Sequence, residues 1–313
     1  MQRVLIVKPS SLGDIVHSLP VAAALAQSGA EVHFAARREY RDLLSICPAV
    51  RRILEFPGRL AGAAAFLGDL RRESYDAVVD LQGLLRSALA TACARTPRRI
   101  GLPDSREGSV LFYDEVVSYP NGVRHAVDRY LSVLPLFGLR TDPPFKPDYG
   151  LVISTAAQEF AARHVGEPGY VVFSPLTRRP AKLWRLDAWA RMAETLIRTG
   201  RRVVVVGHGK IEWPSPEPAW INLIGRTDLP QLCATISRAR LCVTVDSAPM
   251  HLAAALAVPV VALFGPTDPA KVGPYTRDRL ILRGEAPNLA DLSCEGVAAV
   301  VLSELEKRSD RDG

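Results

Sequence analysis

Short runs of β-branched residues alternate along the chain with longer segments of helical periodicity. Such alternation is typical of βαβ units that build parallel sheets. The first half is predicted to contain strands at residues 4–7, 31–34, 52–56 and 77–80, a first helix that carries Val16, Leu19, Val21 and Ala24, and helices at 83–94 and 124–137. The second half is predicted to contain strands at residues 170–173, 202–206, 221–224, 241–245 and 258–264 and helices at 186–199, 229–238, 249–255 and 289–307. The pattern therefore predicts an α/β protein of two doubly wound, Rossmann-like domains that face a central cleft.

A proline-rich segment separates the two halves. Residues 138–147 end in Thr-Asp-Pro-Pro-Phe-Lys-Pro, a composition typical of a linker. At 313 residues the chain is about twice the usual domain size. We therefore expect one domain at residues 1–147 and a second at 148–313, with the last helix free to pack back toward the first domain. The charged final residues, Arg-Ser-Asp-Arg-Asp-Gly, are expected to fray.

Composition narrows the classes of partner. The formal net charge is +6 at pH 7 and is spread along the chain, which suits a phosphate-bearing ligand or an anionic membrane surface. No basic helix or aromatic stacking motif indicates a nucleic-acid partner. The five cysteines are single, without a CxxC pair, which indicates core thiols in a reducing compartment and no metal framework. Without a signal peptide or an apolar run as long as a membrane span, the protein is expected in the cytoplasm, where it could rest on the inner face of a membrane.

Loops that follow the strands of a doubly wound sheet form the binding crevice. The first such loop, Lys8–His17, follows the first strand and matches neither GxxxxGK[ST] nor GxGxxG. Asp14, beside Gly13, is either a helix N-cap or a carboxylate that faces the cleft and takes a proton from a hydroxyl. His17 lies three residues further along the same helix face, where a single histidine is more often structural.

The second loop follows the first predicted strand of the second half. Its two hydroxyls and three cations lie within nine residues: Ser174, Thr177, Arg178, Arg179 and Lys182. A solvated surface turn would account for this cluster as well as a functional site does. In a crevice, the same cations would meet a diphosphate and stabilise the charge of a leaving group.

The third loop is the most informative. Residues 246–249, Asp-Ser-Ala-Pro, join a predicted strand to the helix that carries His251. Ser247 is a suitable helix cap, so the backbone N–H groups at this helix start would form a seat for a phosphate. Asp246 stands just ahead of the helix, in position to accept hydrogen bonds from sugar hydroxyls. The next strand leads into a loop shaped by glycine and proline at residues 264–269.

These loops, in this order, resemble those of glycosyltransferase family 9, the lipopolysaccharide heptosyltransferases, which have the GT-B fold. The likeness spans nearly the whole chain. It is carried by Lys8-x-Ser10-Ser11-x-Gly13-Asp14-x-x-His17, Asp80-x-Gln82-Gly83, Thr177 with Lys182-x-Trp184, Asp246-Ser247-x-Pro249-x-His251-Leu252, and Phe264-Gly265-Pro266-Thr267-Asp268. The pattern from Asp246 to Asp268 is highly specific for the family, and the opening segment is more similar to heptosyltransferase I than to heptosyltransferase II.

The resemblance implies an inverting enzyme, independent of metals and cofactors, that moves heptose from ADP-heptose to a Kdo hydroxyl of the lipid A inner core. It implies that Asp14 is the general base and that Lys182 stabilises the donor diphosphate. The other donor contacts that it implies are Thr177, Arg178, Asp246, Ser247, Ala248, His251, Gly265 and Thr267. The acceptor contacts that it implies are Ser10, Ser11, Gly13, His17 and Gln82.

Three departures from the family pattern bear on the ligands. Ala248 stands where many relatives have glycine, which would narrow the approach of the donor to the backbone. Arg178 follows Thr177 where relatives can have a second threonine. The alanine-rich residues 60–66 replace a basic acceptor loop, and the cations left nearby are Arg51, Arg52, Arg59, Arg71 and Arg72. The alternatives are a family 9 transferase with another donor or acceptor, a GT-B-like sugar-nucleotide epimerase, and a two-lobed small-molecule binding protein.

Overall fold

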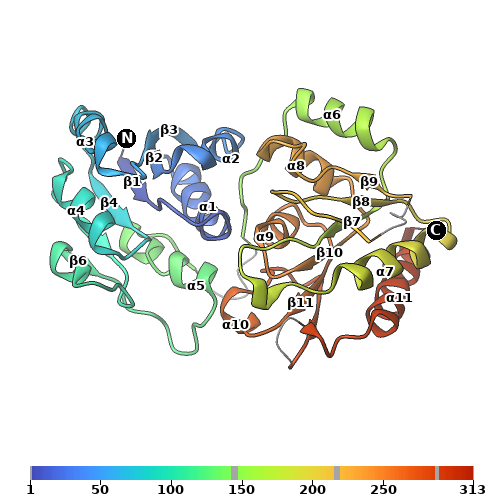
Figure 1. The fold of residues 1–313 in the computed structure, drawn as a ribbon. Coiled ribbons are helices and arrows are strands. Elements are labelled where there is room, and N and C mark those ends of the chain that lie inside the picture. Colours follow the sequence, from blue (N-terminus) through green and yellow to red (C-terminus); the bar gives the residue numbers. More distant parts are fainter. Residues whose placement is uncertain (1, 142–146, 215–218, 286–288, 313) are drawn as a thin grey trace. The chain divides into compact units, whose positions relative to one another are not determined.

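Two compact units make up the protein. The computed structural model describes residues 2–141, 147–214, 219–285 and 289–312, and the chain divides into Met1–Val152 and Ile153–Gly313. Each unit holds a six-stranded parallel sheet with helices on both faces (Figure 1). The predicted α/β architecture is therefore confirmed. The division falls at residue 152 rather than 147, and residues 142–146 of the predicted linker lie outside the described residues.

The first unit has the strand order β3-β2-β1-β4-β5-β6. Its strands are β1 (Arg3–Val7), β2 (Glu31–Ala36), β3 (Val50–Glu55), β4 (Ala77–Asp80), β5 (Arg99–Gly101) and β6 (Glu115–Val116). Its helices, with η for a short 3₁₀ helix, are α1 (Leu12–Gln27), η1 (Arg38–Tyr40), α2 (Arg41–Ser45), η2 (Leu60–Gly62), α3 (Ala63–Arg71), α4 (Leu85–Cys93), η3 (Ser109–Phe112), α5 (Ala126–Leu131) and η4 (Leu134–Phe137). Helices α1 and α5 pack together on one face of the sheet, and α3 and α4 on the other.

The strand order of the first unit switches direction between β1 and β4. β1 pairs in parallel with β2 through Val4 and Val32, and with β4 through Val4 and Ala77. The loops that follow β1 and β4 therefore leave the same carboxyl edge as neighbours, which is where doubly wound sheets bind ligands. A hydrogen bond joins the two loops, from the backbone N–H of Ser10 to Oε1 of Gln82 over 3.2 Å.

The second unit repeats this plan with the strand order β12-β11-β10-β7-β8-β9. Its strands are β7 (Val171–Ser174), β8 (Val203–Val205), β9 (Ile221–Asn222), β10 (Leu241–Val245), β11 (Val260–Phe264) and β12 (Arg279–Arg283). Its helices are α6 (Thr155–Val165), η5 (Pro180–Lys182), α7 (Leu186–Arg198), α8 (Leu229–Ser237), α9 (Ala248–Ala255), α10 (Pro269–Val272) and α11 (Cys294–Asp312). The switch point lies between β7 and β10, so the loops after these two strands are neighbours.

The last helix packs within the second unit. Val301 and Leu305 of α11 share a buried core with Trp189 of α7. The predicted start of this helix at residue 289 is wrong, because Leu289 is itself buried in that core and the hydroxyl of Ser293 accepts the backbone N–H of Gly296 over 3.0 Å. Helix α11 continues to Asp312 and so includes most of the charged final residues.

Other predicted elements differ in length. The helix expected at residues 124–137 is divided into α5 and η4, and Pro135 in the first turn of η4 lacks the backbone N–H that a continuous helix would need. Three strands, β5, β6 and β12, and four helices, α2, α3, α6 and α10, were not predicted. Four cysteines are buried and Cys93 is partly buried, as expected of core thiols. Among the described residues, no helix is long and apolar enough to span a membrane.

Candidate active site

Asp14 lies in the first turn of α1, at the carboxyl edge of the first sheet. The helix N-cap is Ser11, whose backbone N–H donates to Oδ2 of Asp14 over 3.1 Å and whose hydroxyl donates to the same oxygen over 2.8 Å. The hydroxyl of Tyr130, from α5, approaches Oδ1 at 3.5 Å. Asp14 is therefore the third helical residue in a capping box, with Ser11 as its cap, and not the N-cap itself. The two donors from Ser11 fix the orientation of the carboxylate.

A buried lysine accompanies this carboxylate. Lys8, directly after β1, is only 3% exposed, and its Nζ lies 5.1 Å from the centre of the Tyr130 ring, within range of a cation–π contact. Burial lowers the pKa of Lys8, whereas the negative charges of Asp14 and Asp80 favour its protonated form. No role of its own was predicted for Lys8, although its place directly after a buried strand was a signal that could have indicated one.

Asp80 organises the neighbouring loop after β4. Its fully buried carboxylate accepts the backbone N–H groups of Gln82 and Gly83 over 2.8 and 3.0 Å and the hydroxyl of Tyr113 over 2.8 Å. Burial raises the pKa of Asp80, and these hydrogen bonds oppose the rise. Gly83 has φ +64°, and a Cβ there would lie 2.7 Å from Oγ of Ser105, so glycine is required. The result is a rigid turn that presents Gln82 to Ser10.

The remaining predicted acceptor residues occupy different environments. Gly13 is the second residue of α1, next to Asp14. His17 is 3% exposed, and its ring meets the ring of His125 edge-on at 5.2 Å between centroids. This burial favours a structural role for His17.

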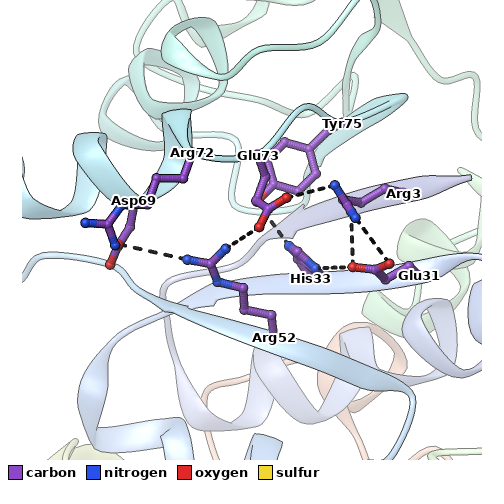
Figure 2. Close-up of polar contacts among 8 residues, drawn as sticks. All are labelled: Arg3, Glu31, His33, Arg52, Asp69, Arg72, Glu73 and Tyr75. Carbon is purple, nitrogen blue, oxygen red and sulfur yellow. Dashed lines mark hydrogen bonds and ion pairs between the residues drawn. The ribbon is translucent and has the colours of Figure 1, made fainter.

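A network of ion pairs lies along the starts of the first unit's strands. Figure 2 shows Arg3 between Glu31 and Glu73, with closest contacts of 3.1 and 2.8 Å. His33 lies 2.8 Å from Glu31 through Nε2 and 3.2 Å from the Tyr75 hydroxyl through Nδ1. A neutral His33 that donates to Glu31 and accepts from Tyr75 satisfies both contacts. This network lies at the amino ends of the strands, whereas Asp14 lies at their carboxyl ends. We therefore assign the network a structural role in the unit and no role in the candidate active site.

The same network accounts for two of the five arginines near the alanine-rich segment. Arg52 pairs with Glu73 at 2.8 Å, and Arg72 pairs with Asp69 at 2.7 Å (Figure 2). Arg71 donates to the carbonyl of Cys93 over 3.3 Å. These three arginines have partners within the first unit, which argues against a free basic cluster for an acceptor at this place.

The second unit gathers three predicted donor residues from three loops. Nζ of Lys182, in η5, forms an ion pair with Oδ2 of Asp246, which follows β10. The hydroxyl of Thr267, after β11, donates to the same oxygen over 2.5 Å. The side chains of Lys182 and Asp246 are only 12% and 6% exposed. A shielded cation, a carboxylate and a hydroxyl thus lie together at the carboxyl edge of this sheet.

Gly265 allows these loops to come close. A Cβ on Gly265 would lie 3.1 Å from a methyl group of Leu289 and 3.3 Å from the carbonyl oxygen of Ala181, tighter than ordinary contact distances. Ala181 directly precedes Lys182. The missing side chain therefore lets the loop that carries Thr267 pack against the loop that carries Lys182.

The start of α9 lies at the switch point of the second sheet. Ser247 is its N-cap residue, and the Ser247 hydroxyl lies 3.5 Å from the hydroxyl of Ser174, at the end of β7, and 3.3 Å from that of Thr244. Ala248 is the first helical residue, and His251, one turn on, is 7% exposed. Free backbone N–H groups at a helix start carry partial positive charge and favour anions.

Thr177 and Arg178 occupy the loop between β7 and η5. Thr177 is partly buried and Arg178 is exposed. The side-chain hydrogen bonds to Asp246 come from Lys182 and Thr267. Thr177 and Arg178 therefore share a loop that leads to Lys182, but they do not join the cluster around Asp246. Within the described ranges, no group of three or more His, Cys, Asp and Glu side chains is placed to hold a metal ion.

The pattern of glycosyltransferase family 9 (heptosyltransferase) matches residues 63–298, well over half of the chain. The match includes the Lys182, Asp246 and Thr267 cluster. The chain belongs to glycosyltransferase family 9. The family resemblance inferred from the loops is confirmed, and the protein is a glycosyltransferase.

Relatives of this family 9 enzyme match along both units. Lipopolysaccharide heptosyltransferase 1 of Pseudomonas aeruginosa is 31% identical over 309 residues, which cover 91% of this chain and 84% of the relative. The solved structure of E. coli heptosyltransferase WaaC with ADP has a TM-score of 0.84 at 27% identity and covers 97% of this chain and 100% of that one. The structure of WaaC with ADP-2-deoxy-2-fluoro heptose has a TM-score of 0.80 at 26% identity and covers 96% and 99%. The predicted GT-B fold is confirmed by these structures.

Proposed function

We propose that this family 9 enzyme transfers heptose from ADP-heptose to a Kdo hydroxyl of the lipopolysaccharide inner core, with inversion and without a metal ion. The observation that carries the proposal is the shielded cluster of Lys182, Asp246 and Thr267 at the switch point of the second sheet. Its cation suits a diphosphate, and its carboxylate and hydroxyl suit sugar hydroxyls. The ADP and ADP-2-deoxy-2-fluoro heptose named for the WaaC structures support this donor, and the P. aeruginosa relative supports this pathway.

The first unit supplies the base in this mechanism. The oxygen of the acceptor hydroxyl attacks the anomeric carbon of heptose, and its proton passes to the Asp14 carboxylate. Oδ2 accepts two hydrogen bonds from Ser11, and the Tyr130 hydroxyl approaches Oδ1 at 3.5 Å; we assign the proton to Oδ1, because that contact is the longer one. Ser10, Gly13 and Gln82 lie beside Asp14 along this edge and are the proposed acceptor contacts.

The second unit supplies the donor contacts. As the new bond forms, the bond from the anomeric carbon to the diphosphate oxygen breaks, and its electron pair leaves with ADP. Lys182 exchanges its contact with Asp246 for the diphosphate, whose negative charge it stabilises together with the backbone N–H groups at the start of α9. Asp246, thus released, accepts hydrogen bonds from heptose hydroxyls. Attack on the face of the sugar opposite the leaving diphosphate gives inversion and requires no nucleophilic carboxylate.

The test is the release of ADP from ADP-heptose with a Kdo-bearing lipid A acceptor. Turnover should require the acceptor, give a product of inverted anomeric configuration by NMR, and proceed equally with and without EDTA. ADP release or a changed sugar without the acceptor would favour the epimerase alternative. Turnover with another nucleotide sugar but none with ADP-heptose would refute ADP-heptose as the donor, while the chain would remain a family 9 enzyme.

Asp14→Asn and Asp14→Ala test the assignment of the base. Asn keeps an acceptor for Ser11 and so preserves the start of α1, whereas Ala removes it and should cost about 1 kcal/mol of stability. Both variants should lose roughly 10²-fold or more in kcat, because neither side chain can take the proton. Ser154→Ala is the matched control: it removes the side-chain cap of α6, so it should lower stability by a similar amount and keep the wild-type rate. A near-normal kcat in Asp14→Asn would return Asp14 to a capping role.

A further inference from the structure

Exposed apolar side chains gather on two adjacent elements of the first unit. Leu85 and Leu89 of α4 are 39% and 47% exposed, and Val110 and Leu111 of η3 are 42% and 84% exposed. Six large hydrophobic side chains are strongly exposed among the described residues, and these are four of them. We call them the α4–η3 surface. Contiguous exposed apolar groups commonly mark an interaction site.

Hydrogen bonds hold η3 and α4 together as one surface. The backbone N–H of Leu85 donates to Oε2 of Glu107 over 3.1 Å. Gly83, just before α4, accepts at its carbonyl from the Ser109 hydroxyl over 3.1 Å and from the backbone N–H of Arg106 over 2.8 Å. The leucines of α4 and the apolar side chains of η3 are therefore held in a fixed relation.

The α4–η3 surface is tied directly to the candidate active site. Gly83 follows Gln82, which accepts the N–H of Ser10 in the loop that leads to Asp14. Asp80 holds both Gln82 and Gly83 through their N–H groups. A body docked on this surface would thus lie close to the proposed acceptor contacts.

The charges around the surface decide what kind of body fits it. Arg86, Arg95 and Arg106 are exposed on α4 and on the segments after it, and Arg71 reaches the carbonyl of Cys93 at the end of α4. The acidic side chains nearest to it along the chain are already engaged: Glu107 accepts the backbone N–H of Leu85, and Asp104 and Asp114 form ion pairs with Arg129 and Arg99. Apolar tips bordered by arginines match the interface of an anionic bilayer, where leucine inserts and arginine meets phosphate. A symmetric contact with a second copy would set arginines against arginines, which costs energy.

We propose that the α4–η3 surface docks the protein on an anionic phospholipid bilayer and so holds the carboxyl edge of the first sheet at the lipid-linked acceptor. The second part of this statement rests on the proposed function. The first part does not, because it needs only the four apolar side chains and the arginines around them.

The experiment is co-sedimentation of the full chain with vesicles of phosphatidylethanolamine and phosphatidylglycerol, in a ratio of roughly 3:1 to supply anionic charge. Wild type should bind, and binding should fall as salt is raised. The double variant Leu89→Asp/Leu111→Asp should lose binding by roughly tenfold or more, because it places two charges where apolar groups insert. Val152→Asp is the matched control: Val152 is 59% exposed and lies outside the α4–η3 surface, so its binding should stay within about twofold of wild type.

Activity separates this proposal from the proposed function. With a water-soluble Kdo-bearing acceptor, the double variant should release ADP at the wild-type rate, whereas with acceptor in vesicles it should be slower. Vesicle binding without any turnover would leave the docking surface standing and overturn the proposed function. Equal vesicle binding by wild type and the double variant, or none by wild type, would overturn the docking surface. So would a concentration-dependent dimer that the double variant abolishes, because the surface would then serve a second copy.

Discussion

The ion pair of Lys182 and Asp246 leads to a prediction that can be worked out from its burial. Both side chains are largely shielded, at 12% and 6% exposure, and Thr267 donates to the same carboxylate oxygen. Lys182→Met keeps the length of the side chain and removes the charge, so Asp246 is left shielded with one neutral donor. Breaking a fully buried pair costs roughly 3–5 kcal/mol. Since Thr267 remains and the site is slightly open, we expect about 2–3 kcal/mol for Lys182→Met.

Removing the negative charge of the pair instead should reduce stability less. Asp246→Asn leaves a lysine whose flexible side chain can turn its ammonium toward water, so we expect about 1–2 kcal/mol. In Lys182→Met/Asp246→Asn no unpaired charge remains. The double variant should therefore be more stable than the sum of the single effects predicts, by about 1–2 kcal/mol.

Urea unfolding of the four proteins measures this coupling. Because the chain has two units, the transition to compare is the one that responds to added ADP. Lys210→Met, at an exposed lysine of the same unit, is the control and should lie within about 0.5 kcal/mol of wild type. A coupling of zero within error would refute the claim that the shielding of this pair makes its charges interdependent.

ADP then tests whether Lys182 also serves the ligand. A ligand that binds only the folded state raises stability according to its concentration and affinity. Saturating ADP should stabilise wild type clearly and Lys182→Met much less, because the variant offers no cation to the diphosphate. Equal stabilisation of both proteins would remove Lys182 from the donor site, whatever its role in stability.

Two further predictions concern the first unit. Lys8→Met removes a buried positive charge that acts on Asp14, so the acid limb of the kcat/KM profile should move to higher pH; an unchanged profile would mean that Lys8 only fills space. Burial lowers the pKa of His33 below its ordinary 6.5. The imidazole therefore takes up a proton at higher pH in the unfolded chain than in the folded one. Stability should fall as pH drops from about 7 to about 5. His33→Gln should flatten that fall in urea unfolding, and equal slopes in the two proteins would contradict the assignment of a neutral His33.

The sequence contained enough information for the sheet layers and for the loops that carry chemistry. Continuous apolar runs such as Val4–Val7 and Val260–Phe264 are typical of parallel strands buried on both faces, and both are strands. The edge strands β6 and β12 had no comparable signal. β6 has two residues, and β12 has a charged residue at each end of a run of only three apolar residues, so pairing with β5 and β11 sets their place rather than local preference.

The contacts inside the candidate site depend on strand order, which periodicity does not encode. Lys182 and Asp246 are 64 positions apart, and they meet because the loops after β7 and β10 are neighbours at the switch point. The bond between Ser10 and Gln82, 72 positions apart, has the same origin in the first sheet. A motif could therefore identify each residue, but only the order of the strands explains which of them touch.

Gly265 shows why residues of a family motif differ in what they do. The family pattern places it among the donor contacts, as it does Lys182 and Thr267. In the structure the absent side chain of Gly265 is what permits Leu289 and the carbonyl of Ala181 to approach, and the loops that this approach joins are those of Lys182 and Thr267. Its contribution to the donor site is then to set the distance between two other residues. A cation and a hydroxyl that must reach one carboxylate oxygen together depend on that distance. A Cβ at this position would force Leu289 or the carbonyl of Ala181 to shift, and so would disturb the cluster even where no ligand touches residue 265.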